Sequence, residues 1–340
     1  MTTLVLSPAD VRRLLPMGTC IDLMEEALGA LARGAAENPL RWGMRLPDSN
    51  RLLGMMPGWL RAREGAELLA GGESLGLKVV AVFPDNHGTP YDSHQGVVML
   101  FDPEDGRPQA ILDASEVTAI RTAAASGLAT RLLAREDAGD LAILGTGVQA
   151  RTHLEAMAAC RELRRVRVYS PTEANRAAFA AREGSRQGPP VEACGSAREA
   201  VAGADLICTT TAAREPVLLG EWIAPGAHVN AVGACVPAAR ELDAAAVARA
   251  RLFADSRESL ESESGDFLLA LREGAVGEDH CEGVLGDLIT RAVPGRGAPD
   301  EVTLFKSLGL AVEDLVAAQY VHARAREQGV GVAVELGGLR

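Results

Sequence analysis

A glycine-rich turn near the middle of the chain has residue types and spacing that could bind phosphate groups. The stretch DLAILGTGVQA places the pattern G-x-G-x-x-A between an apolar strand and a helix, the context required of a dinucleotide-binding turn. The first glycine allows the tight turn, the second lets backbone approach a diphosphate, and free N–H groups at the helix start bind it. A tight turn without a ligand is the alternative. The candidate cofactor-binding residues are Gly145, Thr146, Gly147, Val148, Gln149 and Ala150.

The end of the next strand indicates which dinucleotide would bind. NAD-binding proteins place an Asp or Glu there, on the ribose hydroxyls. Here RVRVYSPTEANR has Ser170 and Thr172 at that edge and Arg176 one turn later, with no carboxylate to repel a 2′-phosphate. We therefore expect NADP(H) to be preferred and NAD(H) to be possible. For Arg176, a place on a solvated helix face is an equally good interpretation.

One cysteine stands where a buried strand breaks into a turn. In VNAVGACVPAAREL, residues 229–242, Cys235 follows a Gly-Ala pair and precedes a proline that stops regular pairing. The chain has six cysteines without a C-x-x-C pair, so we expect neither a disulfide framework nor a metal site. Packing as a small hydrophobic residue is the simplest role for each of them. Whether Cys235 does chemistry is therefore an open question.

Composition limits the class of protein. The chain has 340 residues, of which 47% are hydrophobic and 24% charged, as in ordinary globular proteins. Lys+Arg number 34 against 46 Asp+Glu, for a formal net charge of -12, and this acidity argues against nucleic acid as a partner. No apolar run approaches the roughly 18 residues that cross a bilayer, and the start lacks the pattern of a signal peptide. We expect a cytoplasmic protein with a small-molecule substrate and no membrane partner.

The order of the expected elements predicts two domains. Short apolar strands between residues 41 and 113 and an alanine-rich helix after them indicate a mixed α+β domain over residues 1–118. From residue 119 to 305, strands alternate with helices, which is typical of a Rossmann-like, doubly wound parallel sheet. The stretch TLFKSLGLAVEDLVAAQYVHARAREQG predicts a long amphipathic helix, and a C-terminal helix over residues 306–340 is expected to join the first domain. The fold class is therefore α/β, with a second domain for substrate binding and dimerisation.

Several long motifs, in order along nearly the whole chain, resemble the ornithine cyclodeaminase/mu-crystallin family. They include MRLPD, LGLKVVAVFPDN, HQGVVMLFD, AIRTAAASG, ILGTGVQA, VNAVGA, ARELD and VTLFKSLGLAVEDL. The resemblance implies a homodimer in which the N-terminal sheets of two subunits join. It also implies an oxidoreductase with a nicotinamide cofactor.

The resemblance places the family's carboxylate-binding cations on Arg45, Lys78 and Arg121. Lys78 lies in the otherwise apolar LGLKVVAVF, and Arg121 lies in a helix of Ala, Ile and Leu. A cation in such surroundings needs a partner, and no acid stands at helical or strand spacing on the same face. We favour an anionic substrate as that partner, and pairing with distant acids is the alternative.

Two carboxylates of the cyclodeaminases are missing at the matching positions. Cys235 stands in place of the acid-base aspartate, and Gly54 in place of the carboxylate before Met-Pro. A thiol with its ordinary pKa of about 8.5 is a poor substitute for a carboxylate base. We therefore expect reduction of a cyclic ketimine carboxylate, such as pyrroline- or piperideine-2-carboxylate, with Lys78 and Cys235 as the candidate catalytic residues.

Three other functions are weighed against this hypothesis. Ornithine cyclodeamination and amino-acid dehydrogenation, for example of alanine, are the alternatives within enzymes. A protein that binds NADPH and a ligand without turnover is the alternative of another class. Three cations without acidic partners would argue against mere binding, since unpaired buried cations are costly.

Overall fold

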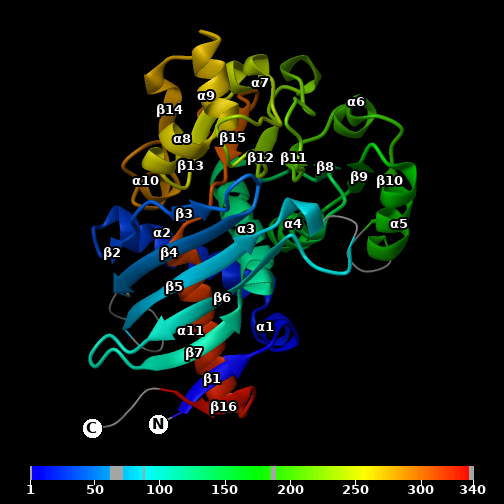
Figure 1. The fold of residues 1–340 in the computed structure, drawn as a ribbon. Helices are drawn as coiled ribbons and strands as arrows, with labels where there is room; N and C mark the ends of the chain where they lie inside the picture. Colours follow the sequence, from blue (N-terminus) through cyan, green and yellow to red (C-terminus); the bar gives the residue numbers. More distant parts are fainter. Residues whose placement is uncertain (1, 62–71, 87–88, 185–188, 337–340) are drawn as a thin grey trace. The chain divides into compact units, whose positions relative to one another are not determined.

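The computed structural model describes residues 2–61, 72–86, 89–184 and 189–336, which form two compact units (Figure 1). Unit 1 contains Met1–Arg121 and Leu310–Arg340, and unit 2 contains Thr122–Gly309. The division falls inside one helix, α3 (Ala114–Leu133). Unit 1 is therefore built from two separate chain segments, whereas unit 2 is a single continuous segment.

Unit 1 has a mixed sheet in the order β16-β1-β7-β6-β5-β4-β2, with β3 also paired to β4. The strands β4 to β7 are antiparallel neighbours, and a turn with Gly106 in the left-handed region joins β6 to β7. Its strands are β1 (Thr2–Leu6), β2 (Ala36–Glu37), β3 (Trp42–Arg45), β4 (Leu52–Arg61), β5 (Glu73–Val82), β6 (His94–Phe101), β7 (Pro108–Asp113) and β16 (Val332–Glu335).

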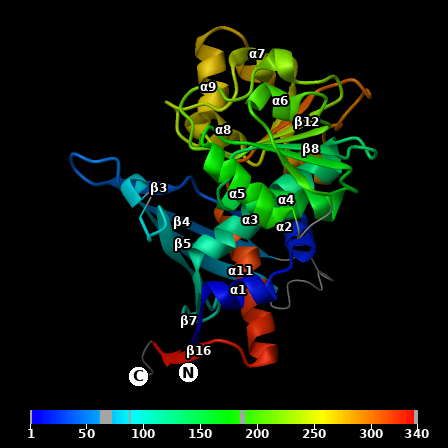
Figure 2. The ribbon, with the colours of Figure 1, turned by 90° about the vertical axis from the view of Figure 1, so that its right-hand side faces the viewer.

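Helices cover one face of this sheet. Successive residues of β4 and β6 alternate between buried and more exposed, so that Met56, Leu60, Val98 and Leu100 lie on the covered face. The helix α11 packs against β4, β5, β6 and α2 (Figure 2). The helical segments of unit 1 besides α3 are α1 (Pro8–Leu14), α2 (Met17–Ala32), the 3-10 turn η1 (Pro84–Asn86) and α11 (Ala311–Gln328).

The expectation of one long C-terminal helix is wrong at both ends. The residues TLFK form the buried strand β15 (Thr303–Lys306) of unit 2, and α11 begins only at Ala311. Gly309, with φ at 81°, separates the two elements. The helix stops at Gly329, whose φ is 64°, and β16 follows and pairs with β1. Residues 337–340 lie outside the described part.

Unit 2 has an entirely parallel sheet in the order β10-β9-β8-β11-β12-β15-β13-β14. Parallel pairing and alternating helices confirm the expected α/β class with a Rossmann-like sheet. Its strands besides β15 are β8 (Asp140–Leu144), β9 (Arg165–Tyr169), β10 (Val191–Ala193), β11 (Leu206–Thr209), β12 (His228–Ala231), β13 (Arg251–Ala254) and β14 (Cys281–Val284).

Helices separate the strands of unit 2, and its core contains residues of both the strands and the helices. The central strands β11 and β12 are buried along their whole length, as strands covered on both faces are. Among the described residues, no helix of either unit is long and apolar enough to cross a membrane. The helical segments are α4 (Val148–Cys160), α5 (Glu173–Glu183), α6 (Ala197–Val201), α7 (Ala244–Arg249), α8 (Arg257–Glu263), α9 (Gly265–Arg272), α10 (Leu285–Ile289), η2 (Gly220–Trp222) and η3 (Glu278–His280).

Candidate functional site

The predicted glycine-rich turn joins β8 to α4 and has a geometry that requires its first glycine. Gly145 has a φ of 121°, and a Cβ there would lie 2.7 Å from both the carbonyl oxygen and the hydroxyl of Thr210. Its N–H donates to the carbonyl of Tyr169 at 2.8 Å. The turn is therefore pressed against the segment that follows β11 and is fixed to the end of β9.

The start of α4 offers donors to a ligand. Gly147 is the N-cap residue and no side chain caps the helix, and a Cβ on Gly147 would meet no atom within 4 Å. Ala150 is fully buried, as close packing of helix and strand requires. The Gln149 Oε1 atom is buried and has no hydrogen-bond partner in the described chain. Uncapped N–H groups and open space together fit the diphosphate of a dinucleotide. The Gln149 oxygen is an acceptor and would suit a hydroxyl group of the ligand, not a phosphate.

The residues expected to select the dinucleotide come together after β9. The Arg176 guanidinium donates to the carbonyl oxygens of Ser170 at 3.1 Å and Pro171 at 3.4 Å, so it lies over the strand end. Thr172 is the N-cap residue of α5, and its side chain makes no capping hydrogen bond. The Arg176 Nη2 lies 4.0 Å from a carboxylate oxygen of Glu173, whose side chain is 88% exposed. This edge therefore presents a cation and hydroxyl groups.

In unit 1, Lys78 and Arg121 share one carboxylate. Lys78 lies on the covered face of β5, and its Nζ is 2.6 Å from Oδ2 of Asp314 in the first turn of α11. The Arg121 Nε is 2.8 Å from the other oxygen of Asp314, and its Nη1 is 2.8 Å from Glu313. The Lys78 ammonium also donates to the Thr118 hydroxyl at 3.4 Å.

These pairs correct one expectation. The partners of Arg121 are 192 and 193 residues later in the chain, so spacing along a helix or strand could not find them. Pairing by distant acids, the alternative interpretation, is what the structure has for Lys78 and Arg121. Because Lys78 and Arg121 are both paired, their burial does not exclude a protein that only binds its ligand. The cluster balances two cations against two carboxylates, which is how buried charges are tolerated.

Burial and neighbouring charges set the protonation of this cluster. The pKa of Lys78 is lowered to about 8, chiefly by burial; the charges of Arg121 and Arg41 also lower it, and the charge and hydrogen bond of Asp314 act in the opposite direction. Burial alone would raise the pKa of Asp314, but Arg121 and Lys78 outweigh it and hold that pKa below its usual value. Lys78 therefore keeps a proton at neutral pH and can release it in mildly basic solution.

Of the two arginines at the ends of β3, Arg41 acts on Lys78, whereas Arg45 is not among the charges that shift the Lys78 pKa. Arg45 pairs with Leu52 at the exposed end of β3 and forms no ion pair with any described residue. Arg41 directly precedes β3, whose first residue, Trp42, pairs with Met55. Extended by one residue, this register puts Arg41 in the row of Met56, the residue paired with Lys78. Paired residues point to the same face of a sheet, and the charge of Arg41 acts on Lys78. The sheet register thus brings to Lys78 an arginine that the sequence argument had passed over.

Cys235 lies in the loop after β12, as predicted, and is half-buried. Its thiol donates to the Val232 carbonyl at 3.4 Å and lies 3.6 Å from the Ser307 carbonyl. Ala234, directly before it, has a φ of 57°, which holds the loop in a sharp turn. Gly54, the second position without a carboxylate, is buried in β4 of unit 1.

A buried ion cluster that we had not assigned supports this loop. Lys306 at the end of β15 donates to the Gly233 carbonyl and lies 2.9 Å from Oδ2 of Asp266. Oδ1 of Asp266 accepts the N–H groups of Glu241 at 2.7 Å and Leu242 at 3.0 Å. The motif ARELD contains Glu241 and TLFK contains Lys306, but only the fold shows that both contact Gly233. The acids and the lysine form one network beneath Cys235.

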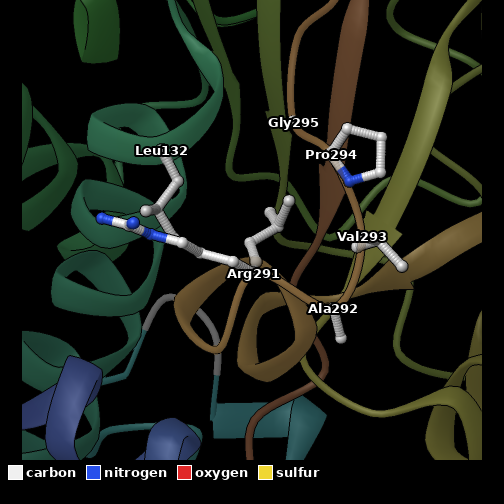
Figure 3. Close-up of a pocket in the computed structure, with 7 residues that line it drawn as sticks. Leu132, Arg291, Ala292, Val293, Pro294 and Gly295 are labelled. Carbon is white, nitrogen blue, oxygen red and sulfur yellow. The ribbon is translucent and has the colours of Figure 1, made fainter.

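A hollow of about 410 Å³ in unit 2 is separate from these residues (Figure 3). The Arg291 side chain extends toward the helix that carries Leu132. None of the residues predicted from the sequence lines the hollow, and it contributes no candidate for chemistry. Its lining residues are Leu132, Leu288, Arg291, Ala292, Val293, Pro294 and Gly295.

Comparison with known proteins places this architecture among its relatives. The family model of the ornithine cyclodeaminase/mu-crystallin family matches residues 1–329. A Delta(1)-pyrroline-2-carboxylate reductase of Bacillus cereus is 37% identical over 98% of this chain and 99% of its own. Ketimine reductase mu-crystallin of Mus musculus is 40% identical over 88% of this chain and 90% of its own.

A solved structure agrees over the whole chain. The Thermococcus litoralis Delta(1)-pyrroline-2-carboxylate reductase in complex with NADH and L-proline is 37% identical, with a TM-score of 0.92 over 98% of this chain and 100% of that one. The glycine-rich turn, the parallel sheet and the matched length agree with these likenesses. The chain belongs to the ornithine cyclodeaminase/mu-crystallin family.

Proposed function

We propose that the protein reduces the C=N bond of a cyclic ketimine carboxylate, 1-pyrroline-2-carboxylate or 1-piperideine-2-carboxylate, to L-proline or L-pipecolate. The observation that carries the proposal is a contrast between the candidate residues of unit 1 and those of unit 2. Buried cations that suit a carboxylate are present at Lys78 and Arg121, while the loop that would need a base carries the thiol of Cys235. The names of the two curated relatives support the same reaction.

The cations of unit 1 would hold the carboxylate of the substrate. Arg121 has a planar guanidinium suited to two parallel hydrogen bonds with a carboxylate, and Asp314 and Glu313 fix its orientation. Arg41 adds positive charge near Lys78, and Arg45 is on the same face further along the sheet. A bound substrate carboxylate would add one negative charge to this cluster of two cations and two acids. The positive charges of Arg41 and Arg45 would stabilise that added charge.

Lys78 would supply the proton that reduction requires. When bound, a reduced nicotinamide supplies the hydride that the imine carbon accepts. The ring nitrogen then takes one proton, and the C=N double bond becomes a C–N single bond. An ammonium with its pKa lowered to about 8 is mostly protonated at neutral pH and is a stronger acid than an ordinary lysine. Asp314 would orient the ammonium, and water would return its proton.

The Cys235 loop would shape the pocket without acting as a base. Cyclisation of ornithine with loss of ammonia begins by removing hydride from an amine carbon, and a base must first take the ammonium proton. The thiol of Cys235 donates to a backbone carbonyl, and Gly54 offers no side chain at all. Reduction of an imine needs neither of the two carboxylates that these positions lack.

The preferred cofactor would be NADP(H), with NAD(H) also accepted. Arg176 lies over the end of β9 beside the Ser170 backbone and the Thr172 hydroxyl, where a 2′-phosphate would meet it. In Arg176→Ala we expect kcat/KM for NADPH to fall about tenfold while that for NADH changes little. Arg182→Ala, in the last turn of the same helix, is the matched control. Equal losses with both cofactors would contradict this preference.

The direct test is cofactor oxidation by the purified protein. NADPH and NADH consumption would be followed with each of the two imines, beside an ammonia assay on L-ornithine. We expect rapid oxidation with an imine and no ammonia. Ammonia from ornithine without imine turnover would establish cyclodeamination instead, and tight NADPH binding without any turnover would indicate a binding protein.

We also propose that the protein forms a homodimer. This assembly is implied by the family resemblance, in which the N-terminal sheets of two subunits join. Light scattering coupled to size-exclusion chromatography would give its mass in solution. A mass of one chain at micromolar concentration would contradict the proposal.

A further inference from the structure

Glu241 is a fully buried carboxylate that accepts four hydrogen bonds from two separate segments. Its Oε1 accepts from the N–H of Thr211 at 2.6 Å and from the Thr211 hydroxyl at 2.7 Å. Its Oε2 accepts from the Gly233 N–H at 2.7 Å and from the Thr209 hydroxyl at 2.8 Å. One side chain therefore connects the segment after β11 to the loop after β12.

Each of these segments borders a part of the candidate site. The segment after β11 includes Thr210, whose carbonyl oxygen and hydroxyl leave no room for a side chain on Gly145 of the glycine-rich turn. The loop after β12 begins at Val232 and carries Cys235 two residues beyond Gly233. Glu241 thus stands between the expected dinucleotide turn and the thiol.

The Cys235 loop is held at Gly233 from both directions. Glu241 accepts its N–H, and Lys306 donates to its carbonyl. A Cβ on Gly233 would lie 2.3 Å from the Thr211 carbonyl oxygen and 2.6 Å from the carboxyl carbon of Glu241. Asp266 in turn binds both Lys306 and the backbone N–H of Glu241. These contacts close a ring of bonds around the first residues of the loop.

We propose that Glu241 is a positioning residue that holds the Cys235 loop in register with the segment beside the glycine-rich turn. The inference deepens the proposed imine reduction, on which it rests, because it assigns the alignment of the imine pocket with the cofactor to one carboxylate. Misplacement of reacting groups by about 1 Å costs about a hundredfold in rate.

Asp205 provides a matched comparison in the same unit. It also accepts two backbone N–H groups, from Gly139 at 3.0 Å and Asp140 at 3.1 Å, and two guanidinium groups, from Arg135 and Arg164. However, it stands immediately before β11, at the amino end of the strand, whereas Glu241 binds Thr209 at the carboxyl end. If Glu241 served stability alone, replacing it at the carboxyl end of β11 should have the same kind of effect as replacing Asp205 at the amino end.

The experiment compares Glu241→Gln with Asp205→Asn in the full-length protein. Alkylation of Cys235 by a maleimide, followed by peptide mass spectrometry, reports on the loop independently of turnover, and the half-buried Cys160 is the internal reference. Binding of NADPH and NADH is measured by fluorescence, and kcat and KM for both imines are measured alongside. Thr209→Val removes one donor to Glu241 without changing volume and replaces Glu241→Gln should that variant not fold.

We expect Glu241→Gln to raise the alkylation rate of Cys235 about tenfold, since an amide group would face two donors. The kcat should fall about tenfold or more, and the KM for the imine should change less. Asp205→Asn should leave the alkylation rate of Cys235 and the kcat unchanged per folded molecule. Thr209→Val should raise alkylation about threefold.

Equal alkylation of Cys235 in Glu241→Gln and Asp205→Asn, with equal kcat, would overturn the inference. If the wild-type protein reduces neither imine, the proposed function fails. The positioning role is then decided by alkylation alone, and it stands only if Glu241→Gln raises the alkylation rate of Cys235 while Asp205→Asn does not.

Discussion

Two lysines lie in strands of different sheets, Lys78 in β5 and Lys306 in β15, and both are almost completely buried, at 4% and 1% exposure. Each forms an ion pair with one aspartate, at 2.6 Å to Asp314 and 2.9 Å to Asp266. Burial lowers the pKa of Lys78 to about 8. Burial also acts to lower the pKa of Lys306, yet that pKa rises to about 12.

The neighbours of each lysine explain the difference. Lys78 has two arginines close enough to act on it, Arg121 and Arg41, against the single charge of Asp314. The pKa of Lys306 is raised by the charges of Asp266, Cys235 and Glu241, which outweigh its burial. Equal burial in a strand thus produces an acid that can give up its proton in one sheet and a permanent cation in the other. Predicting the role of a buried lysine requires the charges around it as well as its depth.

The largest effect that would test this contrast is expected for Lys78→Met. The variant keeps the volume of the side chain but removes both the positive charge and the proton, so we expect kcat/KM for the imine to fall by about 10²- to 10⁴-fold. Dinucleotide binding measured by fluorescence should remain, because the glycine-rich turn belongs to unit 2. Turnover at the wild-type rate would contradict the role assigned to Lys78.

Lys306→Met should act on stability instead. Its loss leaves Asp266 buried without its cation, and breaking a buried pair in this way costs about 3–5 kcal/mol of unfolding free energy. Chemical denaturation of Lys306→Met beside Lys78→Met would measure the difference, since Asp314 keeps Arg121 in the latter. Comparable unfolding free energies for the two variants would remove the distinction drawn between the two lysines.

The pH dependence should follow Lys78. With its pKa at about 8, the ammonium is lost above that pH, so kcat/KM should fall about tenfold per unit toward higher pH. Lys306 stays charged over the same range. The pH dependence of stability should also differ between the two lysines. Between about pH 8 and 10.5, Lys78 holds its proton in the unfolded chain but not in the folded one, so its contribution makes the unfolding free energy rise with pH. The stabilisation from Lys306 is complete below pH 10.5 and is lost toward about 12. A flat rate profile up to about pH 9.5 would argue against Lys78 as the acid.

The smallest effect is expected for Cys235→Ala. A half-buried thiol bonded to backbone carbonyls can be replaced at little cost, so we expect kcat/KM within about twofold of wild type. Cys160→Ala, which changes another half-buried thiol, is the control. Complete loss of imine reduction in Cys235→Ala alone would return a chemical role to the thiol.

Local pattern was sufficient for most of the fold. The apolar alternation of β4 to β7 and the βα order after residue 140 predict the two sheets, because each depends on residues adjacent in sequence. The segment TLFK was misread because its apolar residues also fit the start of the helix that follows. Gly309 separates strand from helix through its backbone conformation, which a helical pattern can overlook.

The site was less accessible from sequence, because its charges meet across long separations. The glycine-rich turn is local and was found, whereas Asp314 and Arg121 are far apart along the chain. Register decided the neighbour of Lys78: Arg41 and Arg45 both lie in or beside β3, and only the pairing of β3 with β4 shows which one stands in its row. Glu241 and Lys306 likewise come together only in the fold, where both contact the backbone of Gly233.

The division of unit 1 into two chain segments sets an order for its assembly during synthesis. A ribosome makes Lys78 and Arg121 early, then all of unit 2, and only afterwards the helix α11 with Asp314 and Glu313. Unit 2 can fold as a continuous segment while it emerges. Until α11 arrives, the two cations have neither their acids nor the cover of that helix and remain hydrated. The last part of the chain therefore closes the core of the first part and forms its charge cluster in the same step.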